Sequence, residues 1–171
     1  MLEWWQKTGK QLYVPKKEKP STRTTYKFDG SVKTKEIFHF EQHQVVSIEV
    51  YDASDNMEFI EIPIYDRDDL QAGKKRLTPD GKPWPFHFPV YGAASLGGLA
   101  KIQAEIEQIE VAVAQIKSET PILEVLFLDA NRAEVTTGAN GRGEYYDFRK
   151  EEGKWKRLNE NGFRGWGSIT H

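Results

Sequence analysis

The sequence predicts an α+β protein in which antiparallel β hairpins, forming a curved sheet, pack against one long amphipathic helix at about residues 95–117. Apolar residues recur at helical spacing in this segment. Short β-prone runs, several with a period of two, lie on both sides of it. Asp-Gly and other turn-forming residues separate these runs, which is typical of antiparallel hairpins.

The composition indicates a folded chain and excludes several kinds of functional site. Of the 171 residues, 38% are hydrophobic and 12% are aromatic, which is too many large apolar side chains for a disordered protein. Cysteine is absent, which excludes disulfides, thiol catalysis and cysteine-bound zinc. This suits a reducing compartment, so we expect a soluble, cytoplasmic protein. No stretch of the sequence approaches the roughly 20 apolar residues of a membrane span.

Charge is unevenly distributed along the chain. Residues 1–36 carry nine Lys or Arg residues and four acidic residues, a balance of +5 within a net charge of −2. We interpret residues 1–22 as a basic, Pro- and Lys-containing tail or linker, and residues 23–171 as a single α+β domain. The remainder of the chain is acidic, so nucleic acid is an unfavoured partner. Binding of single-stranded nucleic acid by the basic N-terminal arm is kept as an alternative.

The domain begins with a predicted hairpin. Thr24–Phe28 and Val32–Phe40 are β-prone runs. Asp29 and Gly30 lie between them, and an Asp-Gly pair favours the tight turn of a hairpin.

Two more strands are predicted at Val45–Tyr51 and Met57–Tyr65. Three aliphatic residues recur with a period of two in each strand: Val46, Ile48 and Val50 in the first, and Ile60, Ile62 and Ile64 in the second. Each strand therefore has one apolar face. Pro63 cannot donate a backbone hydrogen bond, so we expect the second strand to end or to lie at an edge there.

Residues 66–91 are predicted to be a long connection without regular structure. Prolines alternate with aromatic residues in its last part, from Pro83 to Pro89, and this pattern disfavours a helix. It favours an extended chain that lies on the sheet or on a binding face.

The predicted helix has a continuous apolar stripe. Its members are spaced three or four residues apart: Leu99, Ile102, Ile106, Ile109, Val113 and Ile116. The stripe is shorter than three heptads, so we expect it to pack on the sheet of its own chain rather than on the helix of another. Pro121 follows the helix and stops it.

Four strands are predicted after the helix. Ile122–Leu128 is a nearly continuous apolar run, as in a central strand. Ala133–Thr137 follows after a short turn, and Glu144–Arg149 and Lys154–Leu158 then form a hairpin.

The helix and the strands that end in Tyr145-Tyr146-Asp147-Phe148-Arg149-Lys150-Glu151-Glu152-Gly153-Lys154-Trp155-Lys156 resemble the second half of cystatin-like and nuclear-transport-factor-like folds. In those families a curved sheet wraps a helix, and an aromatic residue followed by a Gly-Lys-Trp turn is common in the strand pair. The resemblance implies a cone-shaped fold with room for a pocket between helix and sheet. Such folds host enzymes, inhibitors and binding modules, so no single function is implied.

One group of residues could bind a metal. His39, Glu41 and His43 would lie on the same face of a strand, where two imidazoles and a carboxylate are suitable ligands. Strand neighbours two apart are nearly 7 Å from each other, which is long for ligands of one ion. We therefore favour a polar, solvent-exposed face and expect no cofactor.

Surplus aromatic residues are the strongest functional signal. Trp, Tyr and Arg dominate the hot spots of protein interfaces. The candidate partner-binding residues lie beside Gly, Pro or Arg in expected loops: Trp84, Phe86, Arg142, Phe163, Arg164 and Trp166. The alternative is that such rings cover the sheet and hold loops in place.

The sequence contains no recognisable catalytic constellation, which favours a non-enzymatic interaction or structural module that binds a protein partner or associates with itself. The second hypothesis is a small enzyme or small-molecule binder with a pocket between helix and sheet. An enclosed cavity lined by acids or His with perturbed pKa values would favour the second hypothesis, and a filled core with exposed Trp would favour the first.

Overall fold

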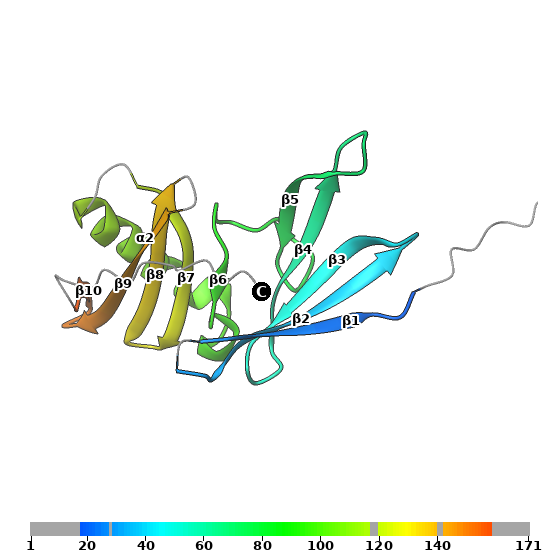
Figure 1. The fold of residues 1–171 in the computed structure, drawn as a ribbon. Helices are drawn as coiled ribbons and strands as arrows, with labels where there is room; N and C mark the ends of the chain where they lie inside the picture. The colour runs from blue at the N-terminus through cyan, green and yellow to red at the C-terminus, as the bar shows by residue number, and fades with distance from the viewer. Residues whose placement is uncertain (1–17, 28, 117–119, 140–141, 159–171) are drawn as a thin grey trace, which may run out of the picture.

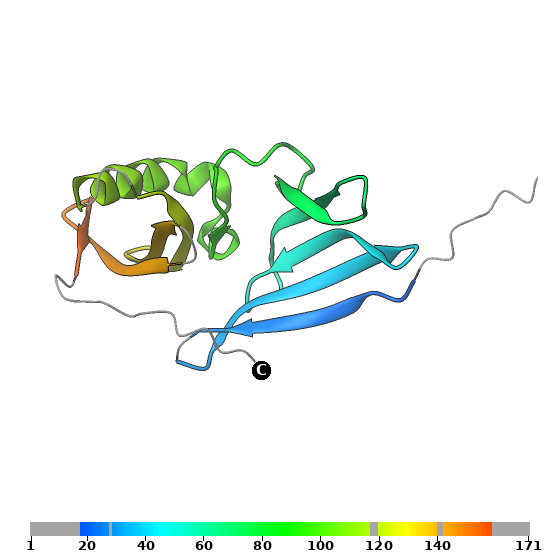
Figure 2. The same ribbon diagram turned by 45° about the horizontal axis from the view of Figure 1, so that its top comes forward.

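A computed structural model describes residues 18–27, 29–116, 120–139 and 142–158. In this part of the chain, ten strands form two five-stranded sheets, which we call sheet A (residues 21–77) and sheet B (residues 90–157) (Figure 1). The predicted α+β class is confirmed. The helix packs on sheet B, whereas no helix formed by the described residues covers sheet A (Figure 2).

Sheet A is an antiparallel meander in which each strand pairs with the next one. Its strands are β1 (Ser21–Tyr26), β2 (Val32–Glu41), β3 (Gln44–Tyr51), β4 (Met57–Tyr65) and β5 (Gln71–Leu77). The expected turn joins β1 to β2: Gly30 has a φ of 82°, and the Lys27 amide donates to the Ser31 carbonyl at 2.7 Å. β1 begins at Ser21, so the strand includes the last two residues of the segment interpreted as a tail.

Sheet B has the strand order β10-β9-β8-β7-β6. Its strands are β6 (Val90–Tyr91), β7 (Ile122–Asp129), β8 (Arg132–Ala139), β9 (Arg142–Glu151) and β10 (Lys154–Arg157). The four strands predicted after the helix are present as an antiparallel meander. β6 pairs in parallel with β7, which requires a crossover, and the helix lies in that crossover.

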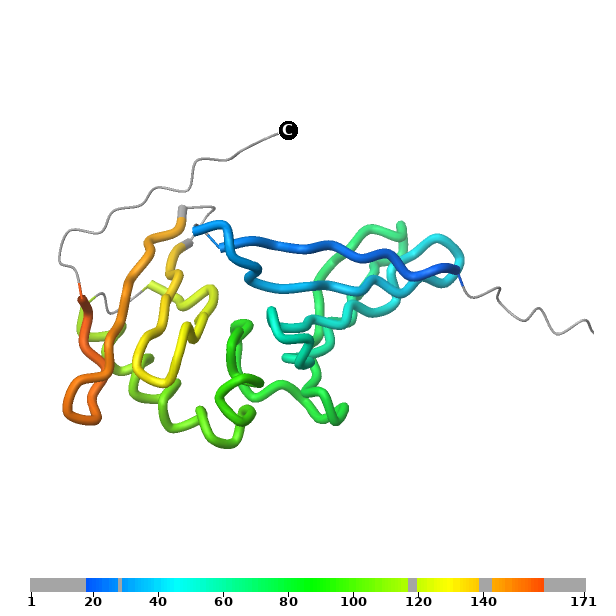
Figure 3. Tube along the Cα trace, turned by 90° about the horizontal axis from the view of Figure 1, so that it is seen from below, coloured from blue at the N-terminus to red at the C-terminus, as the bar shows by residue number. Residues whose placement is uncertain are grey.

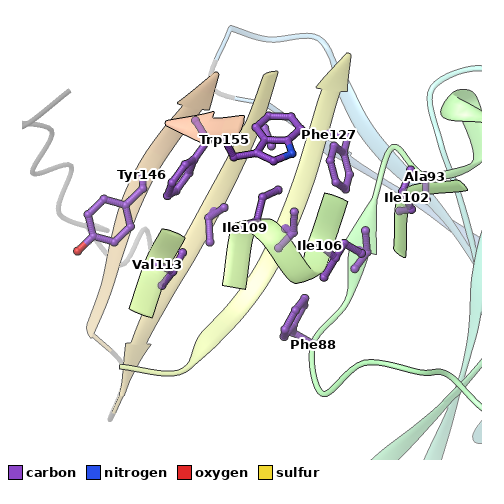
Figure 4. Packing of buried hydrophobic residues seen from close by; sticks show 14 residues of the cluster. Phe88, Ala93, Ile102, Ile106, Ile109, Val113, Phe127, Tyr146 and Trp155 are labelled. Atoms are coloured by element: carbon purple, nitrogen blue, oxygen red, sulfur yellow. The ribbon is translucent and has the colours of Figure 1, made fainter. Parts of the chain in front are cut away.

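The helix α2 (Leu99–Ile116) buries its apolar stripe against sheet B. Ile102, Ile106, Ile109 and Val113 are at most 3% exposed and belong to one hydrophobic cluster with residues of the sheet (Figure 4). The expectation that the stripe packs on its own chain is therefore confirmed. Within the described residues, no helix is long and apolar enough to cross a membrane.

The helix starts four residues later than the sequence predicts. A 3-10 turn, η1 (Ala94–Leu96), precedes it, and Gly97 and Gly98 lie between the two. Both glycines have positive φ values, 98° and 95°, which a right-handed helix does not allow. These two residues separate the turn from α2.

The prediction of an irregular connection at residues 66–91 is wrong in two places. β5 forms within it and pairs with β4 from Ile60 to Tyr65. The two-residue strand β6 forms near its end and pairs with Val125 and Leu126. Neither strand has an alternating apolar pattern of its own, so the pairing partner determines its structure.

Of the two expectations for Pro63, that β4 ends there or that it lies at an edge there, the second is confirmed: the strand continues to Tyr65, and Pro63 lies beyond the end of the β3–β4 ladder. β3 pairs with β4 only as far as Glu61, whereas β5 pairs with it beyond that point. Pro63 is therefore paired on one side only, and its lack of an N–H leaves the β3–β4 ladder intact.

Candidate interaction surface

The register of sheet A determines which side chains share a face. Residues directly opposite each other in an antiparallel pair lie on the same face. Ile37 is opposite Glu49, Glu49 is opposite Ile60, and Ile60 is opposite Leu77. Alternation along β4 places Ile62 and Ile64 on this face too. We call it the isoleucine face, with Ile37, Ile60, Ile62 and Ile64 as its defining residues.

The isoleucine face is not covered as the core of sheet B is. Ile64 is 50% exposed, and Ile37, Ile60 and Ile62 are only half-buried. By contrast, the helix residues Ile106 and Ile109 are 0% exposed. The hydrophobic cluster of the described chain contains no residue of β1–β5. Among the described residues, one of these four side chains is exposed, the other three are partly exposed, and none belongs to the hydrophobic cluster.

The opposite, inner face of sheet A is covered at one end by aromatic rings. Ile48 lies opposite Glu61 on this face, and Val50 lies opposite Phe59. Phe59 is 1% exposed, and its ring centroid is 5.2 Å from that of Trp84 and 5.5 Å from that of Tyr91. Sheet A therefore has apolar side chains on both faces, and the inner face supplies its contact with the rest of the molecule.

Ion pairs occupy much of the remaining inner face. Arg76 donates to Glu61 at 2.8 Å, and its guanidinium lies over the Phe59 ring. Arg23 pairs with Glu36 in the same way across β1 and β2. The Glu61, Arg76 and Glu36 side chains are 13%, 14% and 16% exposed, so these groups are largely removed from water.

Lys33 connects the two sheets. A bulge in the β1–β2 ladder leaves it between the paired residues Thr34 and Val32. Its ammonium donates to Glu124 of β7 at 2.7 Å and lies 4.8 Å from the centroid of the Tyr91 ring. Burial raises the pKa of the Tyr91 phenol, and the Glu124 carboxylate raises it further, so Tyr91 stays neutral.

Glu58 is a buried acid at the same junction. Its carboxylate accepts hydrogen bonds from the backbone amides of Gly92 at 2.6 Å and Ala94 at 3.0 Å. Burial raises the pKa of Glu58 to about 7, although these hydrogen bonds oppose the shift; the nearby Asp52 raises it too. This side chain therefore joins the start of β4 to the turn between β6 and η1.

Polar groups lie within and beside the isoleucine face: Glu49 lies between Ile37 and Ile60. Tyr51 donates to Glu49 at 2.9 Å, and Lys35 donates to Asp55 at 2.6 Å. Burial raises the pKa of Tyr51, and its hydrogen bond to Glu49 adds to that. Apolar side chains surrounded by charged and hydrogen-bonding groups are typical of a protein-binding surface.

Two of the predicted partner-binding residues lie together at the junction of the sheets. Trp84 and Phe86 are half-buried, with ring centroids 5.9 Å apart. Trp84 also packs on Phe59 and donates its indole N–H to the Phe88 carbonyl at 2.9 Å. These contacts hold the 83–89 segment between sheet A and the core. The Arg142 side chain, Phe163, Arg164 and Trp166 lie outside the described residues.

The structure separates the residues of the predicted metal candidate. His39 Nε2 is 3.4 Å from Glu49 Oε1 without a hydrogen bond between them. His43 lies in the β2–β3 turn, with a φ of 66°, and its ring is close to Glu18. Glu41 is the last residue of β2 and is exposed. In the described residues, no group of three or more His, Asp or Glu side chains is arranged to hold a metal ion.

A groove of about 610 Å³ lies on the outer side of α2, next to β10. Its apolar lining comes mainly from Ala104, Val111 and Ala112 of the helix and from Trp155. Trp155 also donates its indole N–H to Glu105 at 2.7 Å, which fixes the ring. The space between α2 and sheet B is filled instead by buried side chains (Figure 4).

Comparisons with protein families, curated proteins and solved structures were made for the whole chain. No family model, curated protein or solved structure matches it. The resemblance to cystatin-like and nuclear-transport-factor-like folds therefore gains no support from a solved structure.

Sequence reasoning missed the isoleucine face as a candidate site. The alternation of Ile60, Ile62 and Ile64 shows one apolar face of β4, as does that of Ile48 and Val50 in β3. The sequence alone does not show that these two sets point to opposite sides of the sheet. That follows from the register, which places Ile48 opposite Glu61. One signal in the sequence could have indicated the isoleucine face. The predicted strands contain more apolar residues than one helix can cover, so some apolar strand residues must lie outside the helix-covered core.

Proposed function

We propose that this chain is a non-enzymatic protein-binding module and that the isoleucine face of sheet A is its binding surface. The supporting observation is the half-buried to exposed set of Ile37, Ile60, Ile62 and Ile64, which no hydrophobic cluster of the described chain includes. Aliphatic surface of this kind is stabilised by burial against a partner, at about 25 cal/mol per Å². A protein partner with an apolar patch of similar size is the natural occupant.

The surroundings of the face support specificity. Glu49, Lys35 and Lys75 lie on the same face as the isoleucines, as the pairing of Ile37 with Glu49 and of Ile62 with Lys75 indicates. Charged groups on the same surface as apolar side chains, whether between them as Glu49 is or beside them as Lys75 is, select partners and set the docking orientation. We place this activity in the cytoplasm, in keeping with the cysteine-free composition.

A second candidate is the binding of a small apolar ligand in the groove between α2 and β10. Its volume of about 610 Å³ is in the range of small-molecule sites, and Val111 on its wall is 59% exposed. Nucleic-acid binding by the basic arm, residues 4–36, is the weakest alternative, because the remainder of the chain is acidic.

Two matched substitutions distinguish the two surfaces. Ile62→Glu places a charge on the isoleucine face, where the opposite residue Lys75 accommodates it within the chain. Val111→Glu makes an equivalent change in the groove. Each variant and the wild type would be immobilised after circular dichroism has shown equal folding, and the proteins captured from a cell extract would be quantified by mass spectrometry.

The proposal predicts a set of proteins that wild type and Val111→Glu retain equally and that Ile62→Glu loses at least tenfold. A retained set that is insensitive to Ile62→Glu would contradict it. Loss of binding with Val111→Glu alone would assign the activity to the groove.

A further inference from the structure

The two edges of sheet A differ in how they are protected against pairing with another chain. β5 carries Lys74, Lys75 and Arg76 in succession, and a bridge between Leu77 and Pro83 closes its end. Lysine on an edge strand discourages pairing with another strand. The β4–β5 ladder also has an irregularity between Ile64 and Tyr65.

β1 carries no run of basic residues and no closing bridge, although its ladder with β2 is also irregular, between Thr25 and Tyr26. Within the described residues it pairs with β2 alone, and five of its six residues are exposed. The strand contains no Lys or Pro, and its charge, on Arg23, is paired with Glu36 of β2. Thr22, Thr24, Thr25 and Tyr26 all favour extended structure. Figure 3 shows β1 along the outer side of the sheet.

We infer that β1 is a self-association edge, at which two copies of this chain pair β1 with β1 in antiparallel orientation about a two-fold axis. The inference concerns the backbone of one edge strand rather than the side chains of the isoleucine face. It therefore holds or fails independently of the proposed function.

The charges select one register for this pairing. Centring the axis on Arg23 would place two arginines opposite each other, and centring it on Thr25 would place Arg23 opposite Lys27. Centring it on Thr22 would bring Pro20, which cannot donate, into the ladder. With the axis at Thr24, Arg23 faces Thr25 of the second copy, and Thr22 faces Tyr26. This register opposes no like charges and pairs β-branched and aromatic residues.

The same register keeps equivalent faces on one side of the combined sheet, because residues opposite each other share a face. The two isoleucine faces would then lie side by side on a continuous ten-stranded sheet. A dimer of this kind would present two copies of the surface to a partner, which raises avidity without any new contact.

The absence of cysteine allows a direct test of the register. Opposite residues in an antiparallel pair have Cα atoms about 4.5–5.5 Å apart, which suits a disulfide. Thr24→Cys should cross-link to itself under mild oxidation and give a covalent dimer on a non-reducing gel. Lys75→Cys, on the exposed opposite edge, is the matched control and should stay monomeric. Equal cross-linking of the two variants, or none with Thr24→Cys, would overturn the inference.

A charge exchange tests whether the contact forms without a cross-link. Thr24→Glu is compatible with the fold, since residue 24 lies opposite Lys35 of β2. In the dimer it would oppose its own copy, so sedimentation should show association weakened at least about fivefold.

Thr24→Lys should likewise weaken self-association; because it lies opposite Lys35 within its own chain, circular dichroism must first show that this variant is folded as the wild type is. An equimolar mixture of the Glu and Lys variants should restore it, because opposite charges then face each other. Failure of the mixture to recover, or a wild type that sediments as a monomer at high micromolar concentration, would overturn the inference. A normal dimer that binds no partner would instead count against the proposed function alone.

Discussion

At the residue scale, the contact between the two halves of the molecule depends on a few backbone-to-side-chain interactions. The Glu58 carboxylate binds the amides of Gly92 and Ala94, and Gly92 in turn lies against Phe127 of sheet B. A buried acid that receives two backbone hydrogen bonds fixes the turn it binds. We therefore expect changes at Gly92 and at Glu58 to alter the stability of the protein.

Gly92→Ala should destabilise the protein strongly. Gly92 has a φ of +80°, and a Cβ there would lie 2.2 Å from the Phe127 carbonyl oxygen, so the backbone would have to move. We expect the free energy of unfolding in urea to fall by more than about 2 kcal/mol. Gly73→Ala is the control, because no atom lies within 4 Å of its added Cβ, and it should change stability by less than about 0.5 kcal/mol. Equal effects of the two substitutions would refute the close packing of this turn.

Glu58 should make stability decrease as the pH rises through the weakly acidic range. Its pKa is raised from 4.5 to about 7 in the folded state, so between these values the folded chain binds more protons than the unfolded chain. The free energy of unfolding should therefore fall by up to roughly 3 kcal/mol across this window. Glu58→Gln lacks the titrating group. Urea denaturation of both proteins from pH 4 to pH 8 should show the difference between them shrinking as the pH rises, and parallel curves would contradict the assignment.

At the element scale, α2 and sheet B form the part of the molecule with a dense core. The helix stripe is buried against β7, β8 and β9, and Trp155 of β10 packs edge-on against Phe127. Lys150 adds an ion pair with Glu105 on the helix at 2.5 Å. Burial alone would raise the pKa of Glu105, but its hydrogen bonds from Lys150 and Trp155 hold it below the ordinary value.

Truncation of the stripe should be costly. Ile106 is 0% exposed, so Ile106→Ala should lower the free energy of unfolding by roughly 2–5 kcal/mol, through lost burial and the cavity left behind. Val111→Ala, at a position that is 59% exposed on the same helix, should change it by less than about 0.5 kcal/mol. Urea unfolding followed by circular dichroism measures both. A small effect at Ile106 would mean that the helix is not held by this core.

The elements differ in how well their sequences predict them. The stripe of α2 and the alternation in β3 and β4 are local patterns, and they predict the corresponding strands and all of the helix except its starting residue. β5 has the sequence Gln-Ala-Gly-Lys-Lys-Arg-Leu, with no apolar face, and is a strand because β4 pairs with it. The sequence predicts a helix start about four residues too early. The cause is the positive φ of Gly97 and Gly98, a backbone conformation that the spacing of apolar residues does not reveal.

The candidate binding surface is harder to predict from the sequence than the helix is. Trp84 and Phe86 were selected for their chemistry, and the structure brings them together at the junction of the sheets. The isoleucine face depends on the relative register of β3 and β4 and on which sheet the helix covers. Both are non-local properties of the fold, which residue spacing does not contain.

At the scale of the whole molecule, the described chain combines a sheet with a complete core and a sheet without one. Sheet A contacts the rest through Phe59, Glu58 and Lys33, and its isoleucine face takes no part in the hydrophobic cluster. An apolar face left in water adds no burial energy to folding, but its burial against another molecule is favourable, which is the physical basis of the proposed binding function.

Cysteine labelling tests this exposure most directly, because the chain has no cysteine of its own. Single variants Ile64→Cys, Val111→Cys and Ile109→Cys would be alkylated under native conditions, and their rates would be compared with those of the unfolded chains. Ile64 and Val111 are 50% and 59% exposed and should react at rates within about tenfold of each other. Ile109, which is 0% exposed, should react orders of magnitude more slowly, because it requires opening of the core. If Ile64→Cys is protected as strongly as Ile109→Cys in the monomer, the isoleucine face is already covered and cannot be the binding surface.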